Sequence, residues 1–486
     1  MDTILKIRNK HRYPPQATLS DDIVNKFIES DQILAELVSK AEGKFIEYSQ
    51  KFPEFLEMSE TEVLEIVHTN VLNMYSKDAS FPYLPLLAKG PWIISFFGGV
   101  IYDLGGYGML GFGHNPSFLD EAIIKPQVMA NYKTRSFAQY EFIKKIKGKI
   151  RNGKCPYTSF AYLNSGSESV TLAARVAEVN TKKLLFDTGK QQGKKIKYLS
   201  LEGGFHGRTE RPSEASDSTL KTYKKYLSSF QDFDKLITVR PNDLEQLENI
   251  FQNCQNENIF IEAAFIEPVM GEGRAGYAIT PKFYEVIRSE TLNHKSILII
   301  DSIQAGLRAS GALSILDYPG FENLAEPDME TFSKALNAGQ YPLSITAFNK
   351  RAEGIYQTGI YGNTMTGNPR ALDIASAILD NFIEAVSNNI RERGYEFKMK
   401  LESLRNQYPT LIEEVLGTGL LVSCKLNSKI SIEGQHGIEL KLRKKGLSVI
   451  HGAGNRLRFT PWFNISSLEI DLVINLLREA LDEFAL

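Results

Sequence analysis

The feature that most constrains the fold is an alternation of short apolar runs with helical patterns, which begins near residue 160. Alternation of this kind is typical of an α/β domain with a largely parallel sheet, in which helices connect successive strands. We therefore predict an α/β fold whose large domain has a mostly parallel sheet flanked by helices. The candidate strands are residues 160–163, 196–201, 263–266, 297–300 and 344–348.

The carboxyl ends of these strands are where functional side chains are expected, because ligands bind at that edge of a parallel sheet. The apolar run 297–300 is followed directly by Asp301, and Lys334 lies further along in the stretch TFSKALNAGQYP. A lysine that can form a Schiff base, together with an acid that can pair with a protonated pyridine nitrogen, is the minimal machinery for holding pyridoxal phosphate. The ordinary alternative for Lys334 is a solvated helix position.

Two turns after predicted strands add to this hypothesis. In FAYLNSGSES, Gly166 and Ser167 begin a helix, where free amides and a hydroxyl suit a cofactor phosphate; the alternative is that Ser167 only caps the helix. In GGFHGRT, Phe205 is placed to stack on a cofactor ring, with plain packing as the alternative. Arg208 is a candidate for binding a substrate carboxylate, with a structural salt bridge as its alternative.

A glycine-rich segment raises a different possibility, a dinucleotide site. Two apolar runs flank Gly98 and Gly99, which predicts a β-hairpin, and Gly106, Gly108 and Gly111 then match G-x-G-x-x-G. A dinucleotide site needs a helix that opens at the third glycine, whereas here the segment runs into a proline. The glycines therefore predict a loop, and we reject a nicotinamide-dependent oxidoreductase.

Composition excludes several classes of partner. The formal net charge of −2 gives no long-range attraction to nucleic acid or to anionic lipid. The three cysteines are widely spaced and form no C-x-x-C pair, so neither a disulfide framework nor a metal site is predicted. No stretch approaches the roughly 18 apolar residues of a membrane span. We expect a cytoplasmic protein with no membrane or nucleic-acid partner.

The predicted domain limits follow changes in pattern along the chain. We predict a smaller α/β domain beside the large one, since strand-like runs and a closing helix return near the carboxyl terminus. The limits are 1–85 for a helical amino-terminal extension, 86–135 for the first part of the small domain, 136–380 for the large cofactor-binding domain and 381–486 for the rest of the small domain.

Seven motifs in order resemble those of the class III pyridoxal-phosphate aminotransferases of fold type I, the family that includes ornithine, acetylornithine and γ-aminobutyrate aminotransferases. They cover the chain from about residue 85 to its end. The motifs are NSGSE at Asn164, FHGRT at Phe205, IEPVMGEG at Ile266, IIDSIQAG at Ile299, SKAL at Ser333, GNTMTGNP at Gly362 and RLRFTP at Arg456.

The resemblance implies a role for each matching residue. Lys334 would hold the cofactor and carry the proton of the transfer, and Asp301 would keep the pyridine nitrogen protonated. Ile303 would pack under the ring, and Gln304 would contact the phenolic oxygen or its surroundings. Thr364 would reach the phosphate of the neighbouring subunit's cofactor, which implies a homodimer with shared active sites.

The resemblance also implies a substrate switch. Arg458 matches the arginine that holds a substrate carboxylate, and Glu272 matches the glutamate that masks this arginine in ω-aminotransferases. The alternative is a permanent salt bridge between domains. The sequence departs from the family at Ser302, where an acid usually follows the cofactor aspartate, and at Met270, where a glutamine is usual. Arg308 stands one position from the usual arginine.

The function implied is transfer of an amino group from an amino acid or ω-amine donor to a 2-oxo acid, with pyridoxal 5'-phosphate as cofactor. Racemisation, decarboxylation and an aminomutase shift are alternatives, because they begin from the same adduct of substrate and cofactor. A binding protein that has kept the fold without turnover is a further alternative. The presence of both Lys334 and Asp301 argues against it, since binding alone would not need the pair.

Overall fold

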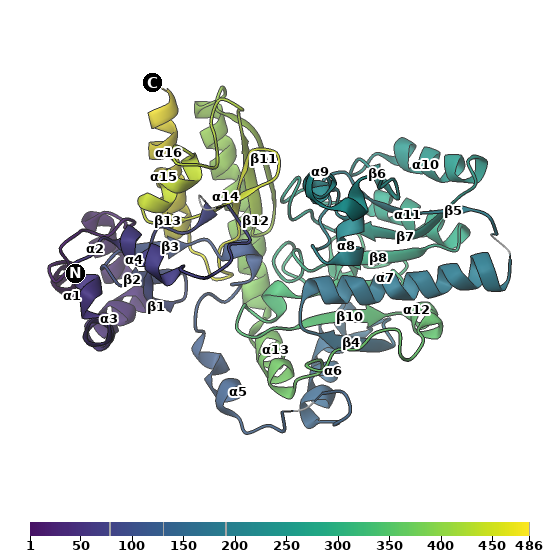
Figure 1. Cartoon of the computed structure of the whole chain (residues 1–486), viewed down its shortest axis with the longest axis horizontal. Helices are drawn as coiled ribbons and strands as arrows, with labels where there is room; N and C mark the ends of the chain where they lie inside the picture. Colours follow the sequence, from purple (N-terminus) through teal and green to yellow (C-terminus); the bar gives the residue numbers. More distant parts are fainter. Residues whose placement is uncertain (77–78, 130, 190–191, 486) are drawn as a thin grey trace. The chain divides into compact units, whose positions relative to one another are not determined.

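The computed structural model describes residues 1–76, 79–129, 131–189 and 192–485, and its contacts divide the chain into two compact units (Figure 1). Unit 1 comprises Met1–Ser117, Arg393–Leu416 and Val422–Leu486, and unit 2 comprises Phe118–Glu392 and Gly417–Leu421. These limits differ from the predicted ones. The short helix α5, Asp120–Ile124, packs against α13, Pro369–Asn381, so the chain after Ser117 groups with unit 2.

Unit 2 is built on a seven-stranded sheet of order β4-β10-β9-β8-β7-β5-β6. The sheet is parallel except for β10, which is antiparallel to both of its neighbours. The predicted α/β class is therefore confirmed, and each of the five predicted strands is present. The strands are β4 Ser159–Leu163, β5 Lys195–Leu201, β6 Leu236–Val239, β7 Ile259–Ile266, β8 Ile297–Asp301, β9 Met329–Phe332 and β10 Ser344–Phe348.

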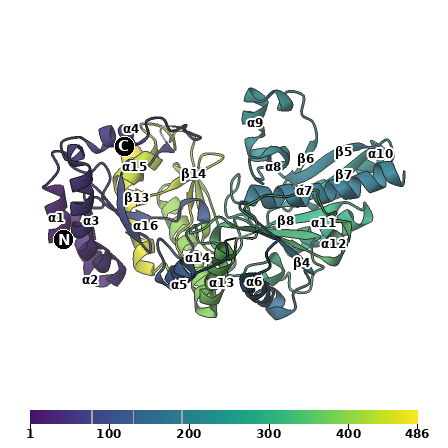
Figure 2. The same cartoon turned by 60° about the horizontal axis from the view of Figure 1, so that its bottom comes forward.

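The core of unit 2 lies between this sheet and α7, Gly166–Lys182. Small and branched side chains along α7 pack on alternate residues of the central strands, such as Ile297 and Ile299. Figures 1 and 2 show α7 running along the sheet. The remaining helices of unit 2 are α6 Phe137–Gly148, α8 Glu210–Ala215, α9 Asp217–Tyr226, α10 Leu244–Asn256, α11 Pro281–Asn293 and α12 Lys350–Ile355, and α14 Glu384–Gln407 continues into unit 1.

Unit 1 contains the predicted hairpin. Strands β2 and β3 pair antiparallel through Trp92 and Tyr102, and Gly98 adopts a φ of +76° in the turn. The sheet of order β1-β2-β3-β13 and most of a second sheet, β11-β12-β15-β14, belong to this unit. The strands are β1 Pro85–Lys89, β2 Trp92–Ser95, β3 Val100–Asp103, β11 Ile412–Thr418, β12 Leu421–Leu426, β13 Leu447–Ser448, β14 Ile450–Gly452 and β15 Arg456–Phe459. The helices are α1 Asp2–Arg8, α2 Asp21–Ser30, α3 Gln32–Lys51, α4 Glu60–Val67, α15 Ile438–Lys444 and α16 Ser467–Ala485.

The glycine-rich segment after the hairpin forms a loop, as predicted. Gly106–Gly108 make a single 3₁₀ turn, and the backbone that follows Gly111 is not helical. A dinucleotide pyrophosphate needs the amino terminus of a helix at that point. The segment therefore lacks the geometry of a nicotinamide site.

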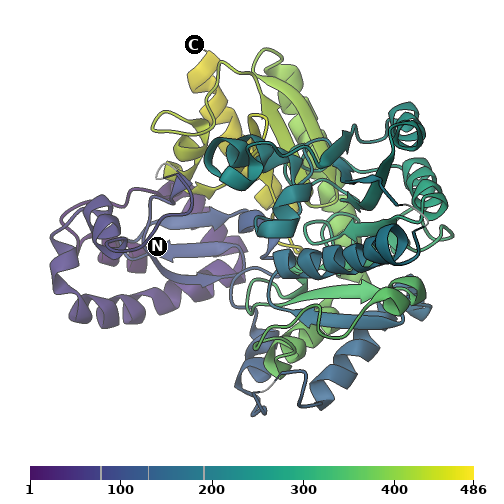
Figure 3. The ribbon, with the colours of Figure 1, turned by 45° about the vertical axis from the view of Figure 1, so that its right-hand side comes forward.

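Among the amino-terminal helices, α3 packs on β1 and β2, and α1 and α2 pack on α3; Figure 3 shows these helices beside the strands. The buried Glu60 carboxylate accepts hydrogen bonds from the backbone N–H groups of Gln16 and Leu84, both at 2.8 Å. Asp31 accepts a hydrogen bond from the Trp92 indole at 2.6 Å. Burial raises the pKa of Glu60 to about 7. These contacts join the extension to the strands of unit 1.

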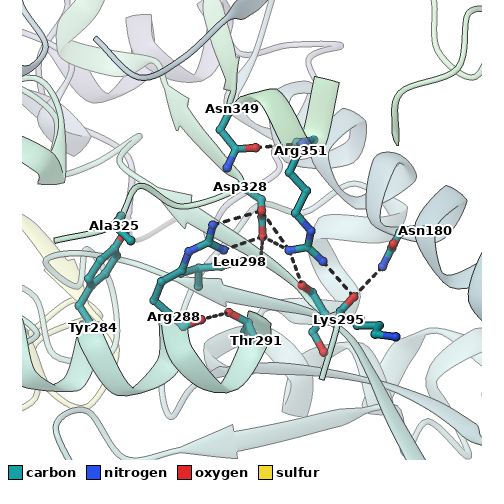
Figure 4. Close-up of polar contacts among 12 residues, drawn as sticks. Asn180, Tyr284, Arg288, Thr291, Lys295, Leu298, Ala325, Asp328, Asn349 and Arg351 are labelled. Atoms are coloured by element: carbon teal, nitrogen blue, oxygen red, sulfur yellow. Dashed lines mark hydrogen bonds and ion pairs between the residues drawn. The ribbon is translucent and has the colours of Figure 1, made fainter. Parts of the chain in front are cut away.

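A buried polar cluster joins the amino ends of β8 and β9 (Figure 4). Asp328 precedes β9, and its carboxylate accepts from Arg288 Nη1 at 2.9 Å and from Arg351 Nη1 at 2.9 Å. The backbone N–H of Leu298 donates to the same carboxylate at 2.9 Å. We call Asp328, Arg288 and Arg351 the amino-end cluster. It ties α11 and α12 to two central strands.

Two findings bear on the expected cellular context. Within the parts of the chain that the structure describes, no helix combines the length and the apolar character that crossing a membrane requires. Cys155, Cys254 and Cys424 are free thiols, and burial raises the pKa of each.

Candidate active site

Asp301 lies at the carboxyl end of β8, near the middle of the unit 2 sheet, and is almost fully buried. Its Oδ2 is 2.8 Å from His206 Nδ1. Its Oδ1 accepts from the Thr331 hydroxyl and from the backbone N–H of Ile303, both at 3.2 Å. The carboxylate is thus held on three sides, by the loop after β5, by β9 and by the loop that follows β8.

His206 was missed by the sequence reasoning, which used its motif only for Phe205 and Arg208. The imidazole is fully buried, and its Nε2 has no hydrogen-bond partner among the described residues. The backbone N–H of His206 donates to the Ser216 hydroxyl at 2.8 Å, which fixes the loop that follows β5. The available signal was a histidine after a strand end, in a chain that already had a candidate aspartate at another strand end.

Lys334 follows β9 in a 3₁₀ turn, Lys334–Leu336, and its φ of +46° is uncommon for a residue with a Cβ. Its Nζ donates to Gln304 Oε1 at 2.5 Å. The Ser333 hydroxyl donates to the Leu343 carbonyl at 2.7 Å, which closes the turn. The structure therefore brings Lys334 and Gln304 together, on a strand and a loop that also contact Asp301.

The start of α7 adjoins the same group of residues. Ser165, rather than Ser167, is the N-cap: its hydroxyl accepts from the Glu168 N–H in a capping box. The backbone of Gly166 lies so close to Ile303 that an added Cβ would come within 2.8 Å of its side chain. A Cβ on Gly207 would collide with the Ser167 hydroxyl. Gly166 and Ser167 thus lie beside Ile303 and the loop of Phe205 and His206.

Glu267 is a second residue that the sequence reasoning did not assign. It follows β7 and accepts from the N–H of Phe205 at 3.0 Å and of Gly271 at 2.8 Å. Burial raises the pKa of Glu267 to about 7, the nearby Asp301 acts in the same direction, and His206 opposes it. Glu267 therefore holds the loop of Phe205 against the turn that carries Glu272.

We call Asp301, His206, Gln304, Lys334 and Glu267 the carboxyl-end cluster. Gly271 connects its two halves, since a Cβ there would come within 2.7 Å of the Gln304 side chain. Two carboxylates, an imidazole, an amide and an amine thus lie on neighbouring strand ends of one sheet. Such an arrangement can hold a cationic nitrogen against an acid and present an amine next to it.

The other predicted residues lie further out. Arg208 is exposed, with its guanidinium carbon 6.0 Å from the Phe205 ring centroid. Thr364 is exposed, and its carbonyl accepts from Asn131 at 3.2 Å. Glu272 is partly buried in unit 2. Arg458 is buried on β15 in unit 1, with its guanidinium carbon 5.4 Å from the Tyr107 ring centroid. Because Glu272 and Arg458 belong to different units, their ion pair stays a prediction.

Comparison with known proteins identifies the family. The model of aminotransferase class III matches residues 75–481. The chain is 29% identical over 426 residues to ornithine aminotransferase 2 of Staphylococcus saprophyticus, covering 85% of this chain and 98% of the relative. It is 29% identical over 412 residues to ornithine aminotransferase 2 of Staphylococcus aureus, covering 82% and 94%.

Solved structures show the same fold. The ornithine aminotransferase of Toxoplasma gondii matches with a TM-score of 0.73 and 21% identity over 89% of this chain and 97% of that one. The acetylornithine aminotransferase of Elizabethkingia anophelis matches with a TM-score of 0.69 and 21% identity over 88% of this chain and 100% of that one. The named relatives are aminotransferases, so racemisation, decarboxylation and an aminomutase shift gain no support.

Proposed function

This chain belongs to the class III aminotransferases, enzymes that use pyridoxal phosphate to move an amino group from an amino donor to a 2-oxo acid, and we propose that the carboxyl-end cluster is its active site. In this proposal Lys334 is the lysine that holds the cofactor and Asp301 faces the pyridine nitrogen. The observation that carries the assignment is the contact of Lys334 Nζ with Gln304 at 2.5 Å, on a strand end adjacent to the one that carries the Asp301–His206 pair.

The residues present fit the cofactor. The start of α7 offers backbone N–H groups and the Ser167 hydroxyl to a phosphate. Gln304 Nε2 is buried and has no hydrogen-bond partner within the described parts of the chain, so it can donate to the phenolic oxygen. Ile303 and Phe205 supply apolar surface for the ring. When bound, pyridoxal phosphate supplies an electron sink that stabilises negative charge on the substrate carbon.

The side chains of the cluster divide the remaining work. Asp301, oriented by His206 and Thr331, presents a carboxylate that keeps the pyridine nitrogen protonated. Lys334 would hold the cofactor through its Nζ. The same amine, once released by a donor amine, would act as the base that takes a proton from the substrate carbon and as the acid that delivers it to the carbon on the other side of the shared nitrogen. Gln304 Oε1 accepts from this nitrogen and so orients it.

We further propose that the donor is an amino acid with a terminal primary amine, of the ornithine type. The curated relatives named above are ornithine aminotransferases. Arg458 is a buried guanidinium suited to a substrate carboxylate, and Glu272 is suited to mask it when the terminal amine reacts. Such a switch lets one site accept a substrate end without a carboxylate and, in the next half-reaction, an end with one.

Self-association is part of the proposal. A groove of about 720 Å³ in unit 2 is lined by Tyr132, Phe160 and Tyr361, among other residues, and by the turn next to Thr364. Phe137 is 86% exposed and Met365 is 62% exposed, although both are large and apolar. In the proposal the groove and these side chains belong to one interface. A homodimer would cover it and would bring Thr364 to the partner's cofactor phosphate.

We also propose a cytoplasmic location, which is supported by the three free cysteines. Free thiols persist in a reducing compartment, whereas disulfides are typical of oxidising ones. Fractionation of the source cells with an antibody to the chain tests this location directly.

Absorption spectroscopy tests the site and the donor class. Purified protein is loaded with pyridoxal phosphate, and its spectrum is recorded before and after ornithine, N-acetylornithine, γ-aminobutyrate or, as a purely α-amino donor, alanine is added without an acceptor. We expect ornithine to convert the visible band to that of the aminated cofactor, and a 2-oxo acid to restore it. Conversion by a purely α-amino donor alone would refute the terminal-amine proposal. Failure to bind an excess of the cofactor would refute the site.

Subunit complementation tests the shared site. Lys334→Ala and Thr364→Arg each inactivate a homodimer in this proposal. A mixed dimer has one site in which Lys334 of one chain meets Thr364 of the other, both unchanged. We therefore expect activity to return when the two inactive variants are unfolded, mixed and refolded together. No recovery, with mixed dimers shown by mass spectrometry, would place Thr364 outside the partner's site.

A further inference from the structure

Strand β9 carries a buried carboxylate, Glu330, two positions after Asp328, which precedes the strand. Among the described residues, no arginine, lysine or histidine forms an ion pair with it. Burial raises the pKa of Glu330, and its hydrogen bonds oppose that shift because they favour the ionised form. Four donors converge on its two oxygens: the hydroxyls of Ser302, Ser314 and Tyr157, each at 2.6 Å, and the backbone N–H of Ile315 at 3.0 Å.

Three of the four donors belong to the two ends of one loop, and the fourth, Tyr157, precedes β4. Ser302 directly follows Asp301 and precedes Ile303 and Gln304, whereas Ser314 and Ile315 lie where the loop returns. The Ser302 hydroxyl and the Ile315 N–H share Oε1, and the Ser314 and Tyr157 hydroxyls share Oε2. One side chain thus ties both ends of residues 302–315 to the strand that leads to Lys334.

The four donors around position 330 need a side chain with two acceptor atoms. A carboxylate does so, whereas an amide has one acceptor oxygen and an NH₂ that only donates. In Glu330→Gln, the amide oxygen could still accept from Ser302 and Ile315. The amide NH₂ would then face the Ser314 and Tyr157 hydroxyls, and both would have to turn and accept hydrogen bonds instead of donating them. Asp328 differs, because its partners are guanidinium groups that lie away from the Asp301 loop.

We propose that Glu330 is a positioning residue for transamination, which fixes the loop start so that Gln304 meets Lys334. This inference rests on the proposed roles of Gln304 and Lys334. Glu330 does not touch the reacting atoms. It acts through Ser302, one residue from Asp301 and two from Gln304, and through β9, whose end sets the backbone of Lys334. The alternative is that Glu330 only stabilises the fold.

The exchange variant Ser302→Glu/Glu330→Ser follows from the geometry. The Ser302 hydroxyl is 2.6 Å from Glu330 Oε1, so a carboxylate that enters from position 302 reaches the same pocket. It meets the same Ser314 and Tyr157 hydroxyls, and the serine at 330 donates back to it. The single variant Ser302→Glu instead places two buried carboxylates together, which repel each other.

The test compares Glu330→Gln, the exchange variant and Asp328→Asn, all loaded with pyridoxal phosphate. The readouts are kcat and KM for the responding donor, the pH midpoint of the cofactor's visible band, and Tm. A misplaced catalytic group lowers turnover by about 10- to 100-fold, so we expect that fall in kcat for Glu330→Gln, with KM nearly unchanged. We expect a shifted pH midpoint as well, and recovery of both in the exchange variant. Asp328→Asn is the control that lowers Tm alone.

Three outcomes overturn the inference: Glu330→Gln lowers only Tm, the folded exchange variant recovers neither kcat nor the pH midpoint, or Asp328→Asn matches Glu330→Gln in every readout. If Glu330→Gln and the exchange variant do not fold, Ser302→Ala decides, since it removes only the contact nearest Asp301. Lowered kcat at unchanged Tm then supports the inference, and unchanged kcat overturns it. Failure of the unmodified protein to bind the cofactor would instead refute the proposed site.

Discussion

An aspartate is buried at each end of the unit 2 sheet, but the charge of its hydrogen-bond partners differs between the two ends. At the amino end, Asp328 receives two guanidinium groups and a backbone N–H (Figure 4). At the carboxyl end, Asp301 receives an imidazole, a hydroxyl and a backbone N–H. The first set holds two fixed positive charges, because arginine keeps its proton in proteins. The second holds none, since histidine can be neutral.

The difference separates a structural cluster from a functional one. A carboxylate whose oxygens already accept from two guanidinium groups has no acceptor position left for a ligand. Among the described residues, Arg288 Nε at the amino end and both His206 Nε2 and Gln304 Nε2 at the carboxyl end are buried without a hydrogen-bond partner. Leaving a buried polar atom unsatisfied costs about 1–3 kcal/mol. At the carboxyl end two such atoms belong to one cluster that also presents the Lys334 amine, so a single ligand there can satisfy both.

The largest expected effect is on turnover at the carboxyl end. Lys334→Ala removes the amine that holds the cofactor and moves the proton, so we expect transamination to fall by at least about 1000-fold. Steady-state assays with the responding donor measure the loss, and fluorescence or absorption reports retained cofactor. Lys282→Ala is the matched control, since this lysine is exposed on α11 and its one ion pair within the described parts of the chain is with the neighbouring Glu285. Near-normal turnover in Lys334→Ala would end the assignment.

Replacing each aspartate with alanine tests the difference between the two ends of the sheet most directly. Asp328→Ala leaves the buried Arg288 and the partly exposed Arg351 without their shared anion, and stranding a buried charge such as that of Arg288 costs about 3–5 kcal/mol of unfolding free energy. Asp301→Ala leaves His206, an imidazole in place of a permanently charged guanidinium, so its cost in stability is smaller. We expect Asp328→Ala to lower stability with little change in turnover per folded molecule. We expect Asp301→Ala to lower turnover with a smaller change in stability. Denaturant unfolding and active-site titration measure the two quantities, and equal losses of stability would refute the contrast.

The sequence predicted one end of the sheet better than the other. Asp301 and Lys334 were found because an apolar strand ends at a carboxylate and a motif places the lysine. His206 and Glu267 were missed because their roles depend on partners 95 and 62 residues away, which no local pattern indicates. Strand β9 was missed because only Met329 and Phe332 of its four residues are apolar, while Glu330 and Thr331 are buried by tertiary contacts.

A smaller effect is expected for the residue that orients the lysine. Gln304→Ala removes an acceptor of the Lys334 amine and the Nε2 that has no hydrogen-bond partner among the described residues, so we expect kcat to fall by about tenfold, comparable to the loss of one or two oriented hydrogen bonds. Gln255→Ala, on α10, is the control, because its amide contacts only His294 at 3.4 Å in the described structure. Presteady-state spectra of the first half-reaction would show whether the loss lies in the proton transfer. An unchanged rate of that step would remove Gln304 from the mechanism.

The smallest effect concerns pH, and two glutamates on or next to β7 sharpen the comparison. Burial raises the pKa of Glu267 and of Glu262 to about 7, but Glu267 adjoins Asp301 and His206, whereas Glu262 bonds to Thr181. A raised pKa means that the folded state binds more protons than the unfolded state between the ordinary value of 4.5 and about 7. Stability therefore falls as the pH rises through that window.

Replacing either residue with glutamine removes one such titration. We expect each variant to flatten the slope of unfolding free energy against pH by up to about 1.4 kcal/mol per pH unit between pH 5 and 7. Denaturant unfolding of the cofactor-free protein at stepped pH gives the slope, which is the readout because both variants also change the absolute stability. The two variants separate in the pH profile of kcat: Glu267→Gln removes a charge that forms beside the Asp301–His206 pair above about pH 7 and so shifts the profile, whereas Glu262→Gln leaves it in place. If both variants shift the pH profile of kcat equally, the charge of Glu267 would affect catalysis no more than that of Glu262, which lies further from the Asp301–His206 pair.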